Sequence, residues 1–291
     1  MIRLAKRTAR AVGIDPKAVL QGLLAASLRR AVRENGWSEL IERLRAAVPD
    51  LRSQYSSDFP SNEYHRFWEI KLRAQHAFQV TCALEALSQV DRSSMTVVDI
   101  GDSSGTHGRY LENLAPAGTI DRFISVNLDP VAVEKIRQAG HEAILDRAEN
   151  LPSHGIKADL MVCFETLEHL TDPLRFLHAI AAEDICDTML VTVPYRRRSR
   201  FGGSHMRSPQ TAMPDRLTAE QVHIYEFSPE DWALLFKFAG WRVVNLRVFR
   251  QYSNALPMRP MAALWRRYDL EGFVGVVMAK DMAISNRYTN W

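Results

Sequence analysis

The sequence has few cysteines, little net charge and no long apolar run, and each shortage excludes a class of protein. Three cysteines, Cys82, Cys163 and Cys186, are spread over 291 residues without a CxxC pair. This usage is typical of reduced thiols and argues against a disulfide framework or a zinc ribbon. The net charge of +3, from 37 basic and 34 acidic residues, gives no indication of nucleic-acid binding.

Membrane-crossing and secretory segments are also missing from the pattern. No apolar stretch approaches the ~18 residues that span a bilayer, and the first residues, MIRLAKRTARAVGI, lack the apolar core of a secretory signal. We therefore expect a cytoplasmic protein. The same residues are weakly amphipathic and basic, so two interpretations stay open. We favour a helical arm packed on the domain over peripheral contact with an anionic membrane surface.

The composition that is present, 46% hydrophobic and 24% charged residues, is ordinary for a globular protein with a full core. Up to about residue 90, apolar residues recur at three- and four-residue spacing, which predicts helices over 18–33, 40–48 and 63–90. From Thr96 onwards, short runs rich in Val, Ile and Leu alternate with helical segments. We therefore divide the chain into a helical extension or lid, residues 1–94, and a binding domain, residues 95–291.

Alternating strands and helices predict βαβ units and a doubly wound, mostly parallel sheet. The end of the chain differs. Ser228-Pro229-Glu230-Asp231 is a good helix start, with Ser as N-cap and Pro at the first helical position. Two strands, WRVVNLRV and GFVGVVMA, follow that helix without a long helix between them, so we expect them to pair antiparallel at the sheet edge. The predicted fold is an α/β, Rossmann-like, seven-stranded sheet with an N-terminal helical extension.

The segment from Thr96 to Gly108, TVVDIGDSSGTHG, reads as a strand, a tight turn and a helix start. Ligands of a doubly wound sheet bind beyond the carboxyl ends of its strands. Gly101 and Gly105 permit a tight turn and close approach to a ligand, and the first amides of the next helix suit an anionic group. Asp99, near the strand end, is placed to meet an amine or ordered water. The segment therefore predicts a nucleoside-type cofactor site.

VVDIGDSSGTHG resembles the first motif of class I S-adenosylmethionine-dependent methyltransferases, in which an acid is followed by glycines at every second position. Asp99, Gly101 and Gly105 match this motif in register, and Ser103 stands where the middle glycine is usual. The resemblance extends from Thr96 to Val193 and implies S-adenosylmethionine as cofactor. It is closest to the small-molecule branch, methyltransferase type 11.

The resemblance also implies cofactor positions after the later strands. After the second strand, SVNLDP places Asn127, Leu128 and Asp129 where the family has an acid that binds the ribose hydroxyls. An Asn at that place forgoes a charge-assisted pair, and Asp129 is the candidate substitute. The full set of predicted cofactor residues is Asp99, Gly101, Asp102, Ser103, Gly105, Asn127, Leu128, Asp129, Asp146, Arg147, Ala148, Phe164 and Glu165.

The run ADLMVCFETLEHLTDPLRFL resembles the fourth-strand motif of that branch, with a Leu-Glu-His segment ahead of a helix. Imidazole titrates near neutrality, so His169 is the first candidate for a catalytic base; the alternative is a structural or capping His. His223 and Tyr195 are second candidates. His169, His205 and His223 with Glu168 match no known ligand spacing, so we predict no metal site.

The one dense basic stretch, YRRRSR, directly follows the fifth strand. Arg196, Arg197 and Arg198 would suit a phosphate or carboxylate on the acceptor, because guanidinium groups bind such anions bidentately. The alternative is a solvated loop. We therefore expect a small acceptor, methylated on O, N or C, that is anionic or linked to a sugar or lipid.

Two other functions stay open at this point. Ser103-x-Gly105-x-x-Gly108 also echoes the dinucleotide fingerprint of nicotinamide-dependent oxidoreductases. The departures at Ser103 and Asn127 are also compatible with a non-catalytic relative that keeps the fold as a binding or scaffold module.

Overall fold

The computed structural model describes residues 15–52, 54, 66–90, 92–203, 206–207, 222–253, 255, 262–267 and 271–287. The basic N-terminal stretch and His205 lie outside these residues. The main helices are α2 (Pro16–Glu34), α3 (Ser38–Ala47), α4 (Arg66–Gln89), α5 (Thr106–Leu114), α6 (Pro130–Gln138), α7 (Pro173–Ala182), α8 (Pro229–Phe238) and α9 (Ala262–Arg267). Short 3₁₀ turns are η1 (Ala148–His154), η2 (Leu167–His169) and η5 (Ser285–Arg287). No helix among the described residues is long and apolar enough to cross a membrane.

One seven-stranded sheet organises the chain, in the order β3-β2-β1-β4-β5-β9-β8. The strands of this sheet are β1 (Met95–Ile100), β2 (Ile120–Asn127), β3 (Glu142–Leu145), β4 (Leu160–Phe164), β5 (Thr188–Tyr195), β8 (Trp241–Arg250) and β9 (Gly272–Lys280). The first five run parallel, whereas β9 is antiparallel to both β5 and β8. The predicted fold and the terminal antiparallel pair are confirmed. A separate two-stranded ribbon, β6 (Arg200–Phe201) with β7 (Tyr225–Glu226), was not predicted.

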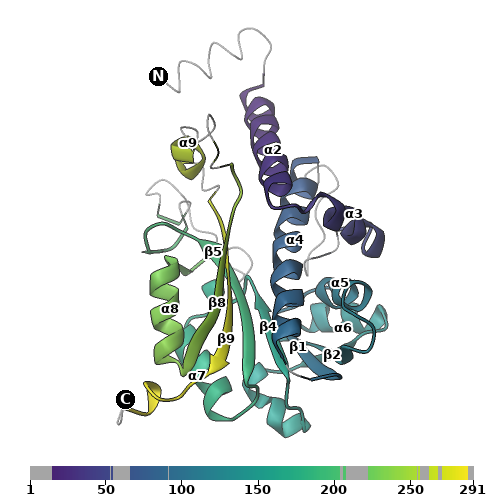
Figure 1. The fold of residues 1–291 in the computed structure, drawn as a ribbon, viewed down its shortest axis with the longest axis vertical. Helices are drawn as coiled ribbons and strands as arrows, with labels where there is room; N and C mark the ends of the chain where they lie inside the picture. Colours follow the sequence, from purple (N-terminus) through teal and green to yellow (C-terminus); the bar gives the residue numbers. More distant parts are fainter. Residues whose placement is uncertain are drawn as a thin grey trace.

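Helices cover both faces of the sheet, because its Val- and Ile-rich strands are apolar on both sides. In β1, Val97 packs into a core cluster shared with α3, α4 and α5, and Val98 packs into a second cluster shared with α7 and α8. Figure 1 shows the strands between the long helix α4 on one side and α8 on the other, with α2 and α3 beyond the end of the sheet.

Helix α4 approaches the sheet closely at Gly275, in the middle of β9. A Cβ at this position would lie 2.7 Å from the Sγ of Cys82 on α4, too close for any side chain. The contact brings the amino-terminal half of α4 over the carboxyl ends of β1 and β4, where ligands bind in doubly wound folds.

Arg73 joins α4 to its neighbours from inside the protein, with only 1% of its surface exposed. Its guanidinium donates to the carbonyls of Leu44 (3.2 Å) and Val48 (2.6 Å) at the end of α3 and to the hydroxyl of Tyr110 on α5 (2.8 Å). One side chain thereby fixes α3 and α5 against α4.

Replacing Arg73 with Met is expected to lower the free energy of unfolding by about 2–4 kcal/mol, since several buried oxygens lose their donor. Arg43→Met on the exposed side of α3 is the matched control, with an expected change within about 0.5 kcal/mol. Urea unfolding followed by circular dichroism measures both. Equal losses for the two variants would show that the Arg73 contacts do not hold the helices together.

Candidate functional site

A cavity of about 850 Å³ opens at the carboxyl ends of β1, β2 and β4, next to α4. Most of the predicted site residues contribute to its lining: Asp99, Gly101, Asp102, Ser103, Asn127, Leu128, Asp129, Asp146, Arg147, Ala148, Phe164, Glu165, His169 and His223. Gly105, Tyr195, Arg196, Arg197 and Arg198 are not part of the lining. The predicted residues that the cavity gathers are up to 124 positions apart in the sequence, from Asp99 to His223.

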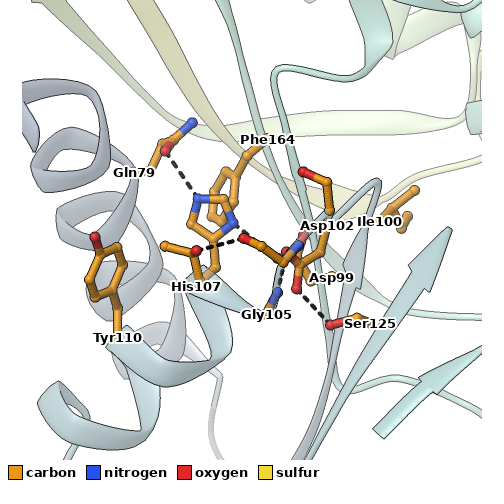
Figure 2. Close-up of polar contacts among 12 residues, drawn as sticks. Gln79, Asp99, Ile100, Asp102, Gly105, His107, Tyr110, Ser125 and Phe164 are labelled. Atoms are coloured by element: carbon orange, nitrogen blue, oxygen red, sulfur yellow. Dashed lines mark hydrogen bonds and ion pairs between the residues drawn. The ribbon is translucent and has the colours of Figure 1, made fainter. Parts of the chain in front are cut away.

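The turn between β1 and α5 is held by the carboxylate of Asp102. Its Oδ1 accepts hydrogen bonds from the backbone amides of Ser104 (3.0 Å) and Gly105 (2.9 Å), and its Oδ2 accepts one from the hydroxyl of Ser125 on β2 (2.7 Å). Figure 2 shows this carboxylate between the turn and β2. Gly101 has φ +85°, and a Cβ there would lie 2.4 Å from the Thr166 hydroxyl oxygen. Only glycine therefore suits this position.

Buried Asp99 pairs with the part-buried His107, a residue that the sequence analysis missed. The Nδ1 of His107 lies 3.1 Å from the Oδ2 of Asp99, and its Nε2 lies 3.2 Å from the Oε1 of Gln79 on α4 (Figure 2). Burial raises the pKa of Asp99 to about 6, against the opposing hydrogen bond from His107. Burial lowers the pKa of His107, but the bond to Asp99 outweighs burial and leaves it raised. The imidazole ring of His107 therefore links Asp99, near the end of β1, to Gln79 on α4.

At the end of β2, the side chain of Asn127 is engaged within the protein. Its Nδ2 donates to the carbonyl of Asp102 (2.8 Å), and its Oδ1 accepts from the amide of Asp129 (2.9 Å). Asp129 in turn caps α6 by accepting from the amide of Val131 (2.9 Å). Both residues line the cavity, and both also stabilise the chain reversal after β2.

After β3, Asp146 accepts hydrogen bonds from His154 (2.8 Å), Asn150 (2.8 Å) and the amide of Arg147 (2.7 Å). These bonds, led by that from His154, lower the pKa of Asp146 to about 2. The carboxylate is therefore ionised throughout the neutral range. Arg147 pairs with Glu149 at 2.7 Å beside it.

Glu165, at the end of β4, has a left-handed backbone, φ 49°, which is uncommon outside glycine and marks a strained position. Its side chain lines the cavity, and its buried Oε1 has no hydrogen-bond partner among the described residues. Burial raises the pKa of this carboxyl to about 8, against a hydrogen bond with Thr192 and the charge of Lys71. The site thus contains an acid that is poorly compensated by the protein.

Glu168, His169 and His223 meet at one end of the cavity, although 54 positions separate the two histidines. The two rings lie edge to face with centroids 4.9 Å apart. The Nδ1 of His169 donates to the carbonyl of Val222 (2.7 Å), and the Nδ1 of His223 lies 3.1 Å from the Oε1 of Glu226. Burial, and then the charge of Glu165, raise the pKa of Glu168 well above its usual range.

The arginines after β5 divide into a buried residue and two exposed ones. Arg196 is 8% exposed, and its guanidinium donates to Glu226 (2.9 Å) and approaches Glu271 (3.5 Å). Although burial raises the pKa of Glu226, the hydrogen bonds from His223 and Arg196 lower it to about 2. Arg197 and Arg198 are exposed. Tyr195, half-buried, lies with its ring 5.4 Å from the guanidinium of Arg250.

Helix α4 supplies lining residues that the sequence analysis did not identify: Lys71, Gln75, His76 and Gln79. Lys71, Gln75 and Gln79 recur every four residues, which places them on one face of the helix. Polar residues repeated at four-residue spacing along one helix face were therefore a usable signal. Gln54, from the segment ahead of α4, lines the cavity as well, and its carbonyl accepts from the hydroxyl of Ser103 (2.7 Å).

A family model described as a methyltransferase domain matches residues 73–246, more than half of the chain. No curated protein matches the sequence. One similar solved structure is the 1,6-didemethyltoxoflavin-N1-methyltransferase of Burkholderia thailandensis with bound 1,6-didemethyltoxoflavin and S-adenosylhomocysteine. It is 14% identical in sequence, the match covers 69% of this chain and 77% of that one, and the TM-score is 0.47.

Two further structures complete the comparison. The magnesium protoporphyrin IX methyltransferase of Synechocystis PCC 6803, with bound S-adenosylmethionine, is 12% identical, with 87% of this chain and 97% of that one covered and a TM-score of 0.48. An S-adenosylmethionine-dependent methyltransferase of Clostridium acetobutylicum is 11% identical, with 76% and 98% covered and a TM-score of 0.49. At these identities the assignment depends on the family model and not on any single neighbour.

Proposed function

The chain belongs to the methyltransferase-domain family and is an S-adenosylmethionine-dependent methyltransferase, and we propose that it methylates a small acceptor bound beside Glu168, His169 and His223. Membership of the family favours this function over the oxidoreductase and scaffold alternatives that the sequence left open. The proposal concerns the acceptor and the roles of individual residues.

The observation that carries the proposal is the charge of the cavity wall. Among the described residues that line the cavity, the basic ones besides the histidines are Lys71 and Arg147, against seven acidic residues: Asp99, Asp102, Asp129, Asp146, Glu149, Glu165 and Glu168. S-Adenosylmethionine bears a sulfonium and an ammonium group, whereas a nicotinamide dinucleotide bears an anionic pyrophosphate. Burial raises the pKa of Glu165 and Glu168 in this wall, and a bound cation offsets that cost by stabilising their ionised forms, whereas a bound anion adds to it.

Two unpartnered oxygens strengthen the fit. The Oε1 atoms of Gln54 and Glu165 are buried, line the cavity and accept no hydrogen bond from the described residues. Buried acceptors without donors are unfavourable. The ammonium, the ribose hydroxyls and the adenine amine of the cofactor are donors of the kind that both oxygens lack.

The bound cofactor supplies an activated methyl group, because its sulfonium is already a good leaving group. The protein's task is therefore to orient the reactants and exclude water. We propose that the β1–α5 turn, fixed by Asp102, binds the cofactor, and that His169 and His223 act on the acceptor. With Nδ1 of His169 donating to Val222, its neutral ring carries the lone pair on Nε2.

We further propose that the helical segment, residues 1–94, serves as a wall or lid for the binding segment, residues 95–291. Gln54 and the amino-terminal half of α4 supply lining residues in support of this role. We propose a small molecule, and not a nucleic acid, as the partner of this site. We also propose that the protein acts in the cytoplasm.

Calorimetric titration with S-adenosylmethionine, S-adenosylhomocysteine and NADH tests the cofactor. We expect the first two to bind and NADH to give no heat.

Gly101→Ala should weaken the affinity for S-adenosylhomocysteine at least about tenfold, because a positive φ costs a non-glycine residue about 1–2 kcal/mol and the added Cβ meets Thr166. Gly118→Ala, with φ +78° and open space around it, is the matched control for backbone strain. NADH binding, or equal affinities of the two variants, would contradict the assignment.

Arg197 and Arg198 are proposed to bind an anionic part of the acceptor that extends beyond the cavity, since both are exposed after β5. The double variant Arg197→Gln/Arg198→Gln should raise the acceptor KM about tenfold with kcat unchanged, because it removes uniform binding. Arg242→Gln on the exposed surface of β8 is the control. An unchanged KM in the double variant would leave these arginines as a solvated loop.

A further inference from the structure

We infer that Glu168, His169 and His223 form a binding site for one divalent transition-metal ion at the acceptor end of the cavity. The site itself is argued from these side chains. The role given to the ion rests on the proposed function. The sequence analysis predicted no metal because the spacing matched no ligand pattern, and the fold supplies the proximity that spacing could not.

The three side chains have the geometry of a ligand set. Each offers one ligand atom, and these atoms lie within 4.8 Å of one another. The closest recorded approach is 3.8 Å, between Nε2 of His169 and Oε1 of Glu168. Ligand atoms of a tetrahedral ion with bonds of about 2.1 Å are about 3.4 Å apart. Small side-chain rotations would therefore bring all three to bonding distance.

Groups behind both rings orient them as metal ligands. Nδ1 of His169 donates to the carbonyl of Val222, and Nδ1 of His223 is paired with the carboxylate of Glu226. A carbonyl or carboxylate behind the ring is the usual outer partner of a metal-binding histidine, because it fixes the tautomer with the lone pair on Nε2. Glu226 is itself held by Arg196 and Arg200, so the orientation of the His223 ring is built into the fold.

Glu168 gives the independent indication that a cation belongs here. Its side chain is completely buried, and neither carboxylate oxygen accepts a hydrogen bond from the described residues. The nearby acid Glu226 is neutralised by arginines, whereas Glu168 makes no salt bridge with a lysine or arginine among the described residues and has the imidazole of His169 at 3.8 Å. A buried carboxylate without hydrogen-bond donors is unfavourable, and a coordinated cation removes that penalty.

The donor set selects the class of ion. Two imidazoles with one carboxylate suit zinc, iron(II), cobalt(II) or manganese(II), whereas calcium and magnesium prefer sets made of oxygen alone. Three protein ligands leave coordination positions open. Because the three residues line the cavity, an acceptor oxygen can fill such a position. The acceptor class is then a small molecule with a hydroxyl, whose pKa the ion would lower.

Cobalt(II) is the probe for this site, since its visible absorption reports nitrogen and oxygen ligands directly. The full chain, stripped of metal with a chelator, is titrated with cobalt chloride. We expect about one ion per chain, with an affinity that falls at least about tenfold in Glu168→Gln and in His223→Ala. His178→Gln on α7, a histidine outside the cavity lining that contacts Ser285, should match the wild type.

S-Adenosylhomocysteine affinity, measured on the same metal-free samples, separates this inference from the proposed function and shows that each variant is folded. Retained cofactor-product binding with no cobalt binding overturns the metal site and leaves the methyltransferase intact. Cobalt binding without S-adenosylhomocysteine binding supports the metal site and overturns the proposed cofactor site. Cobalt binding that neither variant weakens places the ion elsewhere and also overturns the inference.

Discussion

The carboxylate of Asp102 is the constraint on which the rest of the site depends. It accepts two backbone amides of the β1–α5 turn and the hydroxyl of Ser125 on β2, and so fixes the turn to the neighbouring strand. The backbone carbonyl of Asp102 accepts a hydrogen bond from the side-chain amide of Asn127, which holds the end of β2 in place. With both strand ends fixed, Gly101 presents bare backbone to the cavity.

Around this fixed turn the protein keeps acids in a poorly solvated wall. Burial raises the pKa of Asp99 to about 6 and that of Glu165 to about 8, and Glu168 is shifted in the same direction. Each such carboxylate destabilises the folded chain wherever it must be ionised. Cationic ligands relieve this cost, so the proposed binding of the sulfonium cofactor and of the inferred metal ion would each stabilise acids of the same cavity wall.

The sequence predicted the fold well because local patterns determine it. The seven strands and the Ser228-capped helix were recognised from apolar runs, turn residues and a capping signal, whereas the order of the strands in the sheet came only from the structure. Contacts between distant segments could not be read in the same way. Nothing local indicates that Gln79 meets His107, that Arg196 is buried against Glu226, or that Val222 and His223 return to His169. The individual site roles stay predictions.

A crystal structure of the full chain with S-adenosylhomocysteine would show where the cofactor product binds. We expect the product within the cavity, against the turn that Asp102 fixes and between β2 and β4, with its sulfur facing the end formed by Glu168, His169 and His223. Gln54 and Glu165 should then accept hydrogen bonds that they lack without a ligand. A product bound outside this cavity would overturn the proposed cofactor site, and a sulfur turned away from the two histidines would overturn their proposed role at the acceptor.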